Sequence, residues 1–318
     1  PAARDLVAQI NEMAENAKDI PMLSRTHGQP ATPSTLGKEL AVFAYRLGRQ
    51  VKHVENAEFL GKINGATGTF SAHVASVPGA DWLKVSEEFV TGLGLDWNPL
   101  TTQIENHDWQ AELYSSIAHF NQILHNLCTA IWNYISIRFF RQIPVEGATG
   151  SSTMPHKVNP IRFENAEANL EISNALLNTL GSTLIQSRWQ RDLTDSSSQR
   201  NIGVAFGHSI LAISNVAKGL ARLDVAEDVI AEDLDQNWEV LAEAIQMVMR
   251  AEAIAGVEGM EDPYERLKEL TRGQRVDATR LKEFVAGLGL SADAEKRLSE
   301  LTPSTYIGIA PELLKFAQ

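Results

Sequence analysis

The sequence has 318 residues and a net charge of −12 at pH 7. This acidity disfavours a nucleic-acid-binding protein, which needs a basic face, and the single cysteine, Cys128, excludes a disulfide framework and a cysteine-based zinc site. There is no run of 18 apolar residues and no apolar leader segment, so we expect no membrane span and a location in the reducing cytoplasm.

In chain order, apolar residues spaced three or four positions apart predict a series of long α-helices. The first long helix is expected over about 34–61, with Pro33 and Ser34 as first-turn residues. The strongest pattern predicts a helix over about 108–141. Further helices are expected over about 161–184, 200–220 and 226–250.

Alternating β patterns are almost absent, so these helices predict an all-α fold built on a central helical bundle. We expect residues 1–250 to form the bundle domain. Proline and glycine interrupt the later patterns, and residues 251–318 are expected to form a small C-terminal helical domain. Pro1 is not a methionine and a helical pattern is already in progress over 5–18, so we expect this chain to be the later part of a longer protein.

His27 lies in the polar segment 24–33, before the first long helix. The positive end of a helix dipole favours a neutral imidazole, which suits proton exchange at neutral pH. The alternative is a loop histidine with a structural hydrogen bond. The residues of this segment leave both interpretations open.

A second polar segment, residues 147–160, reads GATGSSTMPHKVNP. Backbone N–H groups from Gly150 to Ser152 suit an anion, Lys157 adds a positive charge, and Pro160 starts the next helix. The pattern is not that of a phosphate-binding P-loop. The alternative is a plain flexible linker, which Lys157 and Asn159 beside a helix start do not favour.

A third polar segment holds three arginines within about 13 residues, namely Arg188, Arg191 and Arg200. Guanidinium groups bind carboxylates and phosphates, so the segment is predicted to bind an anionic ligand. In the alternative, Asp192 and Asp195 pair with the arginines internally and the segment only connects two helices. Gln103 is a weaker binding candidate.

No metal ion and no cofactor are expected, because the sequence has neither a paired metal-ligand spacing nor a nucleotide-cofactor fingerprint. The remaining histidines are interpreted as surface or satisfied core residues: His53, His73, His107, His119, His125 and His208.

The segment GSSTMPHKVNP, residues 150–160, resembles the signature loop GSSxMPxKxNP of the fumarase/aspartase superfamily. Within that superfamily, His156 and the segments SRTHGQPATPST and SRWQRDLTDSSSQRN resemble the adenylosuccinate lyase family, and the likeness to its bacterial form extends over nearly the whole chain. The resemblance implies a helical bundle that forms a homotetramer, with each active site shared by three subunits. It also implies cleavage of adenylosuccinate to AMP and fumarate, and of the succinyl-carboxamide ribotide SAICAR to AICAR, in purine synthesis.

By this resemblance, Ser151 is the general base and His27 the general acid. When the loop closes, its donors are expected to stabilise the extra negative charge of the intermediate. Lys157 and the loop amides are expected to stabilise the alkoxide of Ser151. Ser196 and Arg200 are expected at the nucleotide phosphate. The residues that the resemblance implies for substrate binding are Thr26, Gln103, Ser152, Lys157, Val158, Asn159, Asn165, Arg191, Ser196 and Arg200.

The family's N-terminal domain, with a further histidine segment, is not in these residues, so we expect the 318-residue chain alone to be inactive. One alternative is argininosuccinate lyase or another fumarate-releasing member, against which His156 and the arginine segment argue. The other is a non-catalytic helical scaffold, against which the presence of Ser151 and His27 argues.

Overall fold

The computed structural model describes residues 1–144, 154, 157–260, 262–271 and 276–317. Helices dominate these residues, and the short strands among them form two-stranded sheets, so the all-α class is confirmed. The chain forms two compact units. The first comprises Pro1–Val7, Arg46–Asn133 and Pro144–Arg222, and the second Ala8–Tyr45, Tyr134–Ile143 and Leu223–Gln318. The domain boundary at residue 250 stays a prediction.

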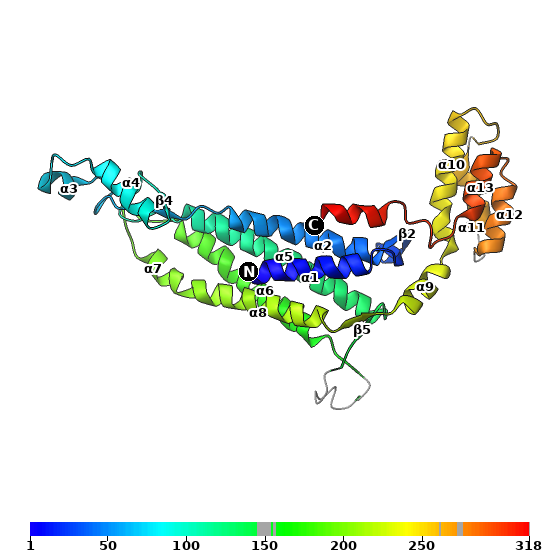
Figure 1. Cartoon of the computed structure of the whole chain (residues 1–318), viewed down its shortest axis with the longest axis horizontal. Helices are drawn as coiled ribbons and strands as arrows, with labels where there is room; N and C mark the ends of the chain where they lie inside the picture. Colours follow the sequence, from blue (N-terminus) through cyan, green and yellow to red (C-terminus); the bar gives the residue numbers. More distant parts are fainter. Residues whose placement is uncertain (145–153, 155–156, 261, 272–275, 318) are drawn as a thin grey trace. The chain divides into compact units, whose positions relative to one another are not determined.

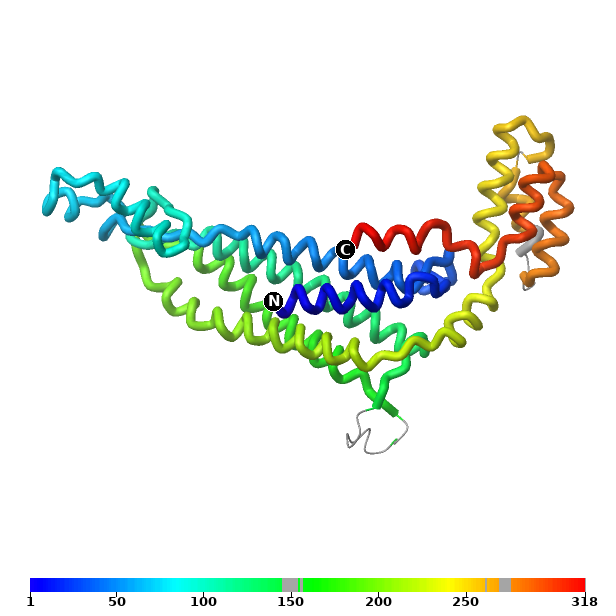
Figure 2. The backbone as a smooth tube through the Cα atoms, viewed as in Figure 1, coloured from blue at the N-terminus to red at the C-terminus, as the bar shows by residue number. Residues whose placement is uncertain are grey.

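Three long helices lie side by side in the first unit: α5 (Asp108–Ser136), α6 (Ile161–Leu184) and α8 (Ile202–Leu220) (Figures 1 and 2). The bounds of α6 are those predicted from the sequence. The helix expected over 108–141 instead ends at Ser136, because Arg138 adopts a left-handed conformation with φ of 66°. The helix expected from residue 200 begins at Ile202, after a short 3-10 turn over Gln199–Asn201.

Apolar side chains from the three helices form a buried cluster whose members are Leu113, Tyr114, Ala118, Leu177, Leu180, Leu184 and Ala205. Full burial of one leucine side chain contributes about 1.5–3 kcal/mol. The remaining elements of this unit are shorter. They are the paired strands β3 (Leu60–Gly61) and β4 (Asp96–Trp97), and the helices α3 (Ser71–Ser76), α4 (Trp82–Gly92) and α7 (Thr194–Ser198).

A polar network crosses this apolar core. The fully buried Asn121 of α5 donates from Nδ2 to Ser173 Oγ and Asn174 Oδ1 on α6, both at 3.0 Å. Its Oδ1 accepts from Ser209 Oγ of α8 at 2.7 Å, and Ser173 Oγ donates to the Ala205 carbonyl at 2.8 Å. A buried amide is costly unless it is hydrogen-bonded, so this network holds the three helices in one register.

The contact between α6 and α8 leaves no room for a side chain at Gly219. A Cβ added there would lie 2.8 Å from Cζ of the buried Phe163, whereas a Cβ at Gly207 of the same helix meets no atom within 4 Å.

We expect Gly219→Ala to lower the free energy of unfolding by about 1–3 kcal/mol through overpacking. Gly207→Ala is the matched control and should raise it by up to about 1 kcal/mol, since alanine is the better helix former. Urea unfolding of the complete protein with each change measures both values. A shift of the same sign and size in the two variants would contradict the packing argument.

The second unit contains most of α1 (Ala2–Asn16), an antiparallel hairpin of β1 (Pro21–Thr26) and β2 (Gln29–Thr35), and the start of α2 (Leu36–Glu55). The predicted helix over 34–61 is therefore too long at both ends. Thr35 caps the helix by accepting a hydrogen bond from the Lys38 backbone N–H at 3.1 Å. Pro33 and Ser34 belong to β2. The strands β5 (Phe140–Gln142) and β6 (Leu223–Val225) form another antiparallel pair.

The single helix expected over 226–250 is wrong. The structure has α9 (Glu227–Asp235), a 3-10 turn (Trp238–Leu241) and α10 (Ala242–Ile254). Asn237, with φ of −127° and ψ of 58°, interrupts the helix, and its Nδ2 donates to the Asp233 carbonyl at 2.6 Å. An asparagine side chain that bonds the backbone in this way competes with the helical pattern.

The last helices are α11 (Pro263–Thr271), α12 (Ala278–Ala286) and α13 (Ala292–Glu300), followed by a 3-10 segment over Ala310–Phe316. The helices α11, α12 and α13 gather with α10 around a buried apolar cluster that includes Ile245, Met249, Leu281, Val285 and Leu298 (Figure 1). In the part of the chain that the structure describes, no helix is long and apolar enough to cross a membrane.

Candidate active site

The sequence-predicted site residues fall into separate groups. Thr26 and His27 belong to the second unit, and the other predicted site residues that the structure describes belong to the first. Ser151 and Ser152 lie outside the described residues. Each group is built by its own local structure.

His27 occupies the tip of the β1–β2 hairpin. His27 and Gly28 form its two-residue turn, with φ of 52° and 75°. Positive φ at both central residues matches the right-handed twist of the strands. Thr26 and His27 are exposed. The sequence interpretation that placed His27 in the field of a helix N-terminus is wrong, because α2 begins only at Leu36 and that field fades beyond the first turn.

The hairpin is anchored by side chains of the second unit. Arg25 donates from one guanidinium nitrogen to both carboxylate oxygens of Asp233 on α9, at 2.8 Å each, and its guanidinium lies 5.6 Å from the centre of the Phe139 ring. Thr32 of β2 hydrogen-bonds to Glu243 of α10. These contacts restrain the two strands on either side of the His27 turn.

Gln103 lies in a bend of the first unit, and the residue is exposed. Its backbone N–H donates to the Gln190 carbonyl at 3.4 Å. The Lys62 ammonium donates to the Gln103 carbonyl at 2.6 Å and to the Thr102 carbonyl at 3.3 Å. Burial lowers the pKa of Lys62. The backbone hydrogen bond from Gln103 to Gln190 thus connects the Gln103 segment to the arginine segment.

A loop beside Gln103 was not singled out from the sequence. Asn64 donates from Nδ2 to Thr101 Oγ1 at 2.8 Å, and a Cβ at Gly68 would lie 1.9 Å from the Thr101 carbonyl oxygen. The hydroxyls of Thr69 and Ser71 are 2.6 Å apart. The signal for this loop in the sequence is its run of small and hydroxyl residues.

The arginine segment is held by internal ion pairs, as one of the two sequence interpretations proposed. Arg191 donates from one terminal nitrogen to Asp195 Oδ1 at 2.7 Å, and Arg188 pairs with Asp192 at 3.4 Å. Arg200 and Ser196 are exposed. Arg200 has no ion pair with any described residue.

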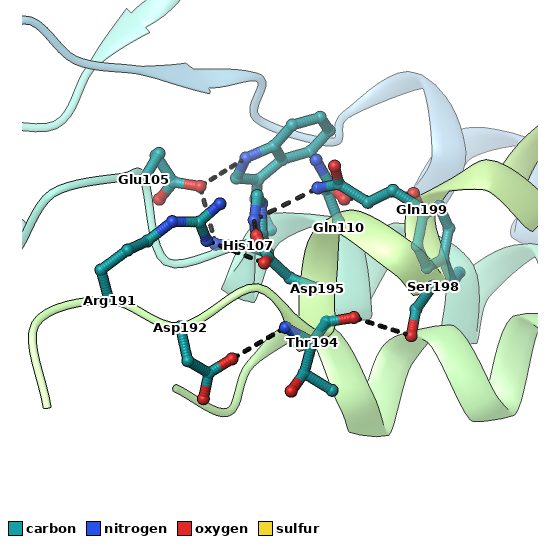
Figure 3. A network of polar contacts seen from close by, with 11 residues as sticks. Glu105, His107, Gln110, Arg191, Asp192, Thr194, Asp195, Ser198 and Gln199 are labelled. Carbon is teal, nitrogen blue, oxygen red and sulfur yellow. Dashed lines mark hydrogen bonds and ion pairs between the residues drawn. The ribbon is translucent and has the colours of Figure 1, made fainter. Parts of the chain in front are cut away.

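His107, which the sequence analysis treated as a surface or core residue, lies at the centre of this region (Figure 3). It is buried, and its Nε2 is 3.2 Å from Asp195 Oδ2 and 3.2 Å from Gln199 Nε2. Its φ is 65°. His107 and Asp195 are 88 positions apart, so their contact could not be found from local sequence patterns.

Asp195 is an ionised carboxylate in a buried position. Burial disfavours the charged form, but hydrogen bonds from Arg191, His107 and the Ser196 backbone N–H outweigh it, so the pKa of the carboxyl lies below its usual range.

This lowered pKa makes the free energy of unfolding depend on pH. The ionised form stabilises the fold above the unfolded-state pKa of about 3.9, and that contribution is lost as pH falls through the lowered folded-state value. In Asp195→Asn the contribution is absent. We therefore expect the free energy of unfolding of the variant to fall less steeply than that of the wild type between about pH 5 and pH 2. Urea unfolding at a series of pH values checks this, and parallel curves would contradict it.

The remaining predicted residues lie at the other end of α6. Asn165 is in its first turns, where Oδ1 accepts from Asn215 Nδ2 of α8 at 2.9 Å. Lys157 and Val158 are exposed and Asn159 is half-buried just before the helix. Asn165 and Leu184 are 19 positions apart on α6, which at a rise of about 1.5 Å per residue separates them by about 28 Å. Lys157, Asn159 and Asn165 are therefore far from Gln103 and Arg191 within one chain.

A small cavity of about 120 Å³ lies beside Asp195, between the 102–108 segment and the C-terminal end of α6. Its lining includes Thr102, Ile104, Asn106 and Gln186. Ligand pockets have volumes of about 300–1,000 Å³, so this cavity alone is small. In the described part of the chain, no three His, Cys, Asp or Glu side chains are grouped as a metal site.

The chain matches known proteins over nearly its whole length. A family model described as "Lyase" matches residues 1–173, and one described as "Adenylosuccinate lyase C-terminal" matches residues 187–307. The curated adenylosuccinate lyase of Escherichia coli (strain K12) is 54% identical over 310 residues, which are 98% of this chain and 67% of that protein. Those of Vibrio cholerae and Haemophilus influenzae are 52% and 51% identical, over 98% and 99% of this chain and 68% of each relative.

The chain belongs to the adenylosuccinate lyase family. The family resemblance inferred from the sequence motifs is thus confirmed, and with it the class of carbon–nitrogen lyases. The chain spans about two thirds of the length of these adenylosuccinate lyases.

Two solved structures share the fold of this family member. They are the 3-carboxy-cis,cis-muconate lactonizing enzyme from Pseudomonas putida and the fumarate lyase from Mesorhizobium sp. BNC1. Each is 21% identical to this chain, with a TM-score of 0.75. Each match covers 99% of this chain, and 70% of the first and 71% of the second of those proteins.

Proposed function

We propose that the protein cleaves adenylosuccinate to AMP and fumarate, and SAICAR to AICAR and fumarate, by β-elimination. The observation that carries this proposal is the 54% identity to an adenylosuccinate lyase over 98% of the chain. The Gln103–Arg191–Arg200 region supports it, because the exposed Gln103 and Arg200 and the half-buried Arg191 offer amide and guanidinium donors that suit an anionic nucleotide.

In the proposed reaction, Ser151 takes a proton from the carbon beside a succinyl carboxylate. The electron pair of that C–H bond forms the double bond of fumarate, and the C–N bond breaks with its pair going to nitrogen. His27 donates a proton to the leaving nitrogen. The intermediate carries extra negative charge on the carboxylate, and donors placed toward that charge lower the barrier. Lys157 and Asn159 are the proposed donors among the described residues.

We propose that Ser196 and Arg200 bind the nucleotide phosphate, and that Gln103 and Arg191 bind other polar parts of the substrate. The donors that Arg191 does not use on Asp195 are available for this role. Thr26, Ser152, Val158 and Asn165 complete the proposed binding set.

The distance of about 28 Å between Asn165 and Leu184 on α6 supports an active site assembled from several copies of the chain. Within one copy, Lys157 and Asn165 lie too far from Gln103 to share a site with it. We propose a homotetramer whose sites each use three subunits. A cytoplasmic location is proposed with it, where a reducing environment keeps Cys128 as a thiol.

The direct test is cleavage of adenylosuccinate by the complete purified protein, followed by absorbance, with argininosuccinate as the control substrate. We expect loss of adenylosuccinate with formation of AMP and fumarate, and no release of fumarate from argininosuccinate. Fumarate from argininosuccinate alone would instead favour the argininosuccinate lyase alternative. No turnover of either substrate would favour the scaffold alternative.

The proposed acid and base are tested by Ser151→Ala and His27→Asn. Asparagine tolerates the left-handed turn conformation that His27 adopts, so the hairpin is kept while the proton donor is lost. We expect each change to lower kcat by about 10²–10⁴-fold. Circular dichroism shows whether the fold is retained. A folded variant with near-normal kcat would remove that residue from its role.

A further inference from the structure

We propose that Asp195 and His107 are positioning residues that orient Arg191 toward the anionic substrate. This inference rests on the proposed function and deepens it. Neither residue needs to touch the substrate. The argument follows the hydrogen bonds outward from Arg191 (Figure 3).

Arg191 is fixed at one end only. One terminal nitrogen donates to Asp195 Oδ1 at 2.7 Å, and the side chain is 24% exposed. A guanidinium group has five N–H donors. The others have no hydrogen bond to a described residue, so Asp195 fixes the direction of the group while most of its donors stay available for a carboxylate or phosphate.

Asp195 is itself held on both oxygens. The residue is 5% exposed, with Oδ1 bonded to Arg191 and Oδ2 to His107 Nε2. A buried carboxylate is stable only when it is paired and hydrogen-bonded. The contact with His107 stops the carboxylate from rotating, and a fixed carboxylate in turn fixes Arg191.

The proton on His107 follows from the same contacts. A carboxylate only accepts, so Nε2 must carry the hydrogen that is donated to Asp195. The same nitrogen cannot also accept from Gln199 Nε2, 3.2 Å away.

The backbone of His107 is held in a conformation that is unusual for histidine. Its φ of 65° is left-handed, a conformation that residues with a side chain rarely adopt. Glu105 maintains it: one carboxylate oxygen accepts from the His107 backbone N–H at 2.8 Å and from Trp109 Nε1 at 2.9 Å. The other oxygen accepts from Asn98 Nδ2 at 3.1 Å. Such strain persists where its surroundings fix it, and here it places the ring on Asp195.

The pair also joins two proposed binding residues. His107 lies four positions after Gln103, and Asp195 lies four positions after Arg191. The His107–Asp195 contact therefore sets the spacing between the Gln103 segment and the arginine segment, to which the Gln103 to Gln190 backbone hydrogen bond also contributes.

The test is a double-mutant cycle on the complete protein, with kcat and KM for adenylosuccinate measured for the wild type, Asp195→Asn, Arg191→Gln and the double variant. We expect Asp195→Asn to raise KM about tenfold or more with a smaller change in kcat, because it removes binding that substrate and transition state share. The double variant should match Arg191→Gln alone, since Asp195 acts through Arg191.

Asp192→Asn is the matched control. It removes a carboxylate three positions away that pairs with the exposed Arg188, and KM should stay within about twofold, as for an ion pair with one solvent-exposed partner. His107→Asn keeps a residue that tolerates positive φ, and it should raise KM less than Asp195→Asn. If Asp195→Asn does not fold by circular dichroism and urea unfolding, the cycle is made with His107→Asn and Arg191→Gln.

The outcomes separate the two proposals. If the wild type turns over adenylosuccinate but the changes in KM from Asp195→Asn and Arg191→Gln multiply in the double variant, the positioning role is overturned and the proposed function stays intact. An equal rise of KM in Asp192→Asn would also overturn it, since the effect would then reflect the charge of the segment alone. Absence of turnover in the wild type would overturn the proposed function and this inference together.

Discussion

A single buried amide, Asn121, constrains how the three long helices of the first unit pack. Apolar stripes alone tolerate a slip of one helical turn, because one leucine can replace another in the contact. The amide does not, since each donor or acceptor that loses its partner costs about 1–3 kcal/mol. With partners on both α6 and α8, Asn121 sets where each end of α6 lies, and both groups of proposed binding residues in this unit depend on those ends.

Long, uninterrupted helices could be predicted well from the sequence, and α6 agrees with its predicted bounds because Pro160 precedes a regular apolar pattern. The pattern over 226–250 failed because a single asparagine, Asn237, bonds to the backbone and breaks the helix without interrupting the apolar spacing. The β1–β2 hairpin was missed for another reason. Its strands contain prolines and few alternating positions, and its turn uses a histidine with positive φ.

The candidate site was predictable where its residues are close in the sequence. The spacing of Arg191 and Arg200 and the loop before α6 stand out as local patterns. The contact of His107 with Asp195 does not, because it joins positions 88 residues apart and depends on a backbone angle that periodicity does not report. From the sequence, Asp195 was considered only as an internal partner of the arginines, and the structure shows that pairing with Arg191. The buried His107, which fixes the orientation of the Asp195 carboxylate, was not anticipated.

The length of α6 has a consequence for mixed assemblies. A rigid rod of about 28 Å between Asn165 and Leu184 makes the two ends of one chain contribute to different places. If each catalytic centre draws its two halves from different copies, as proposed, a chain damaged at Lys157 and a chain damaged at Arg191 can assemble with each other. Some centres of that hybrid then contain only intact halves, so two defective genes expressed in one cell can restore each other's activity.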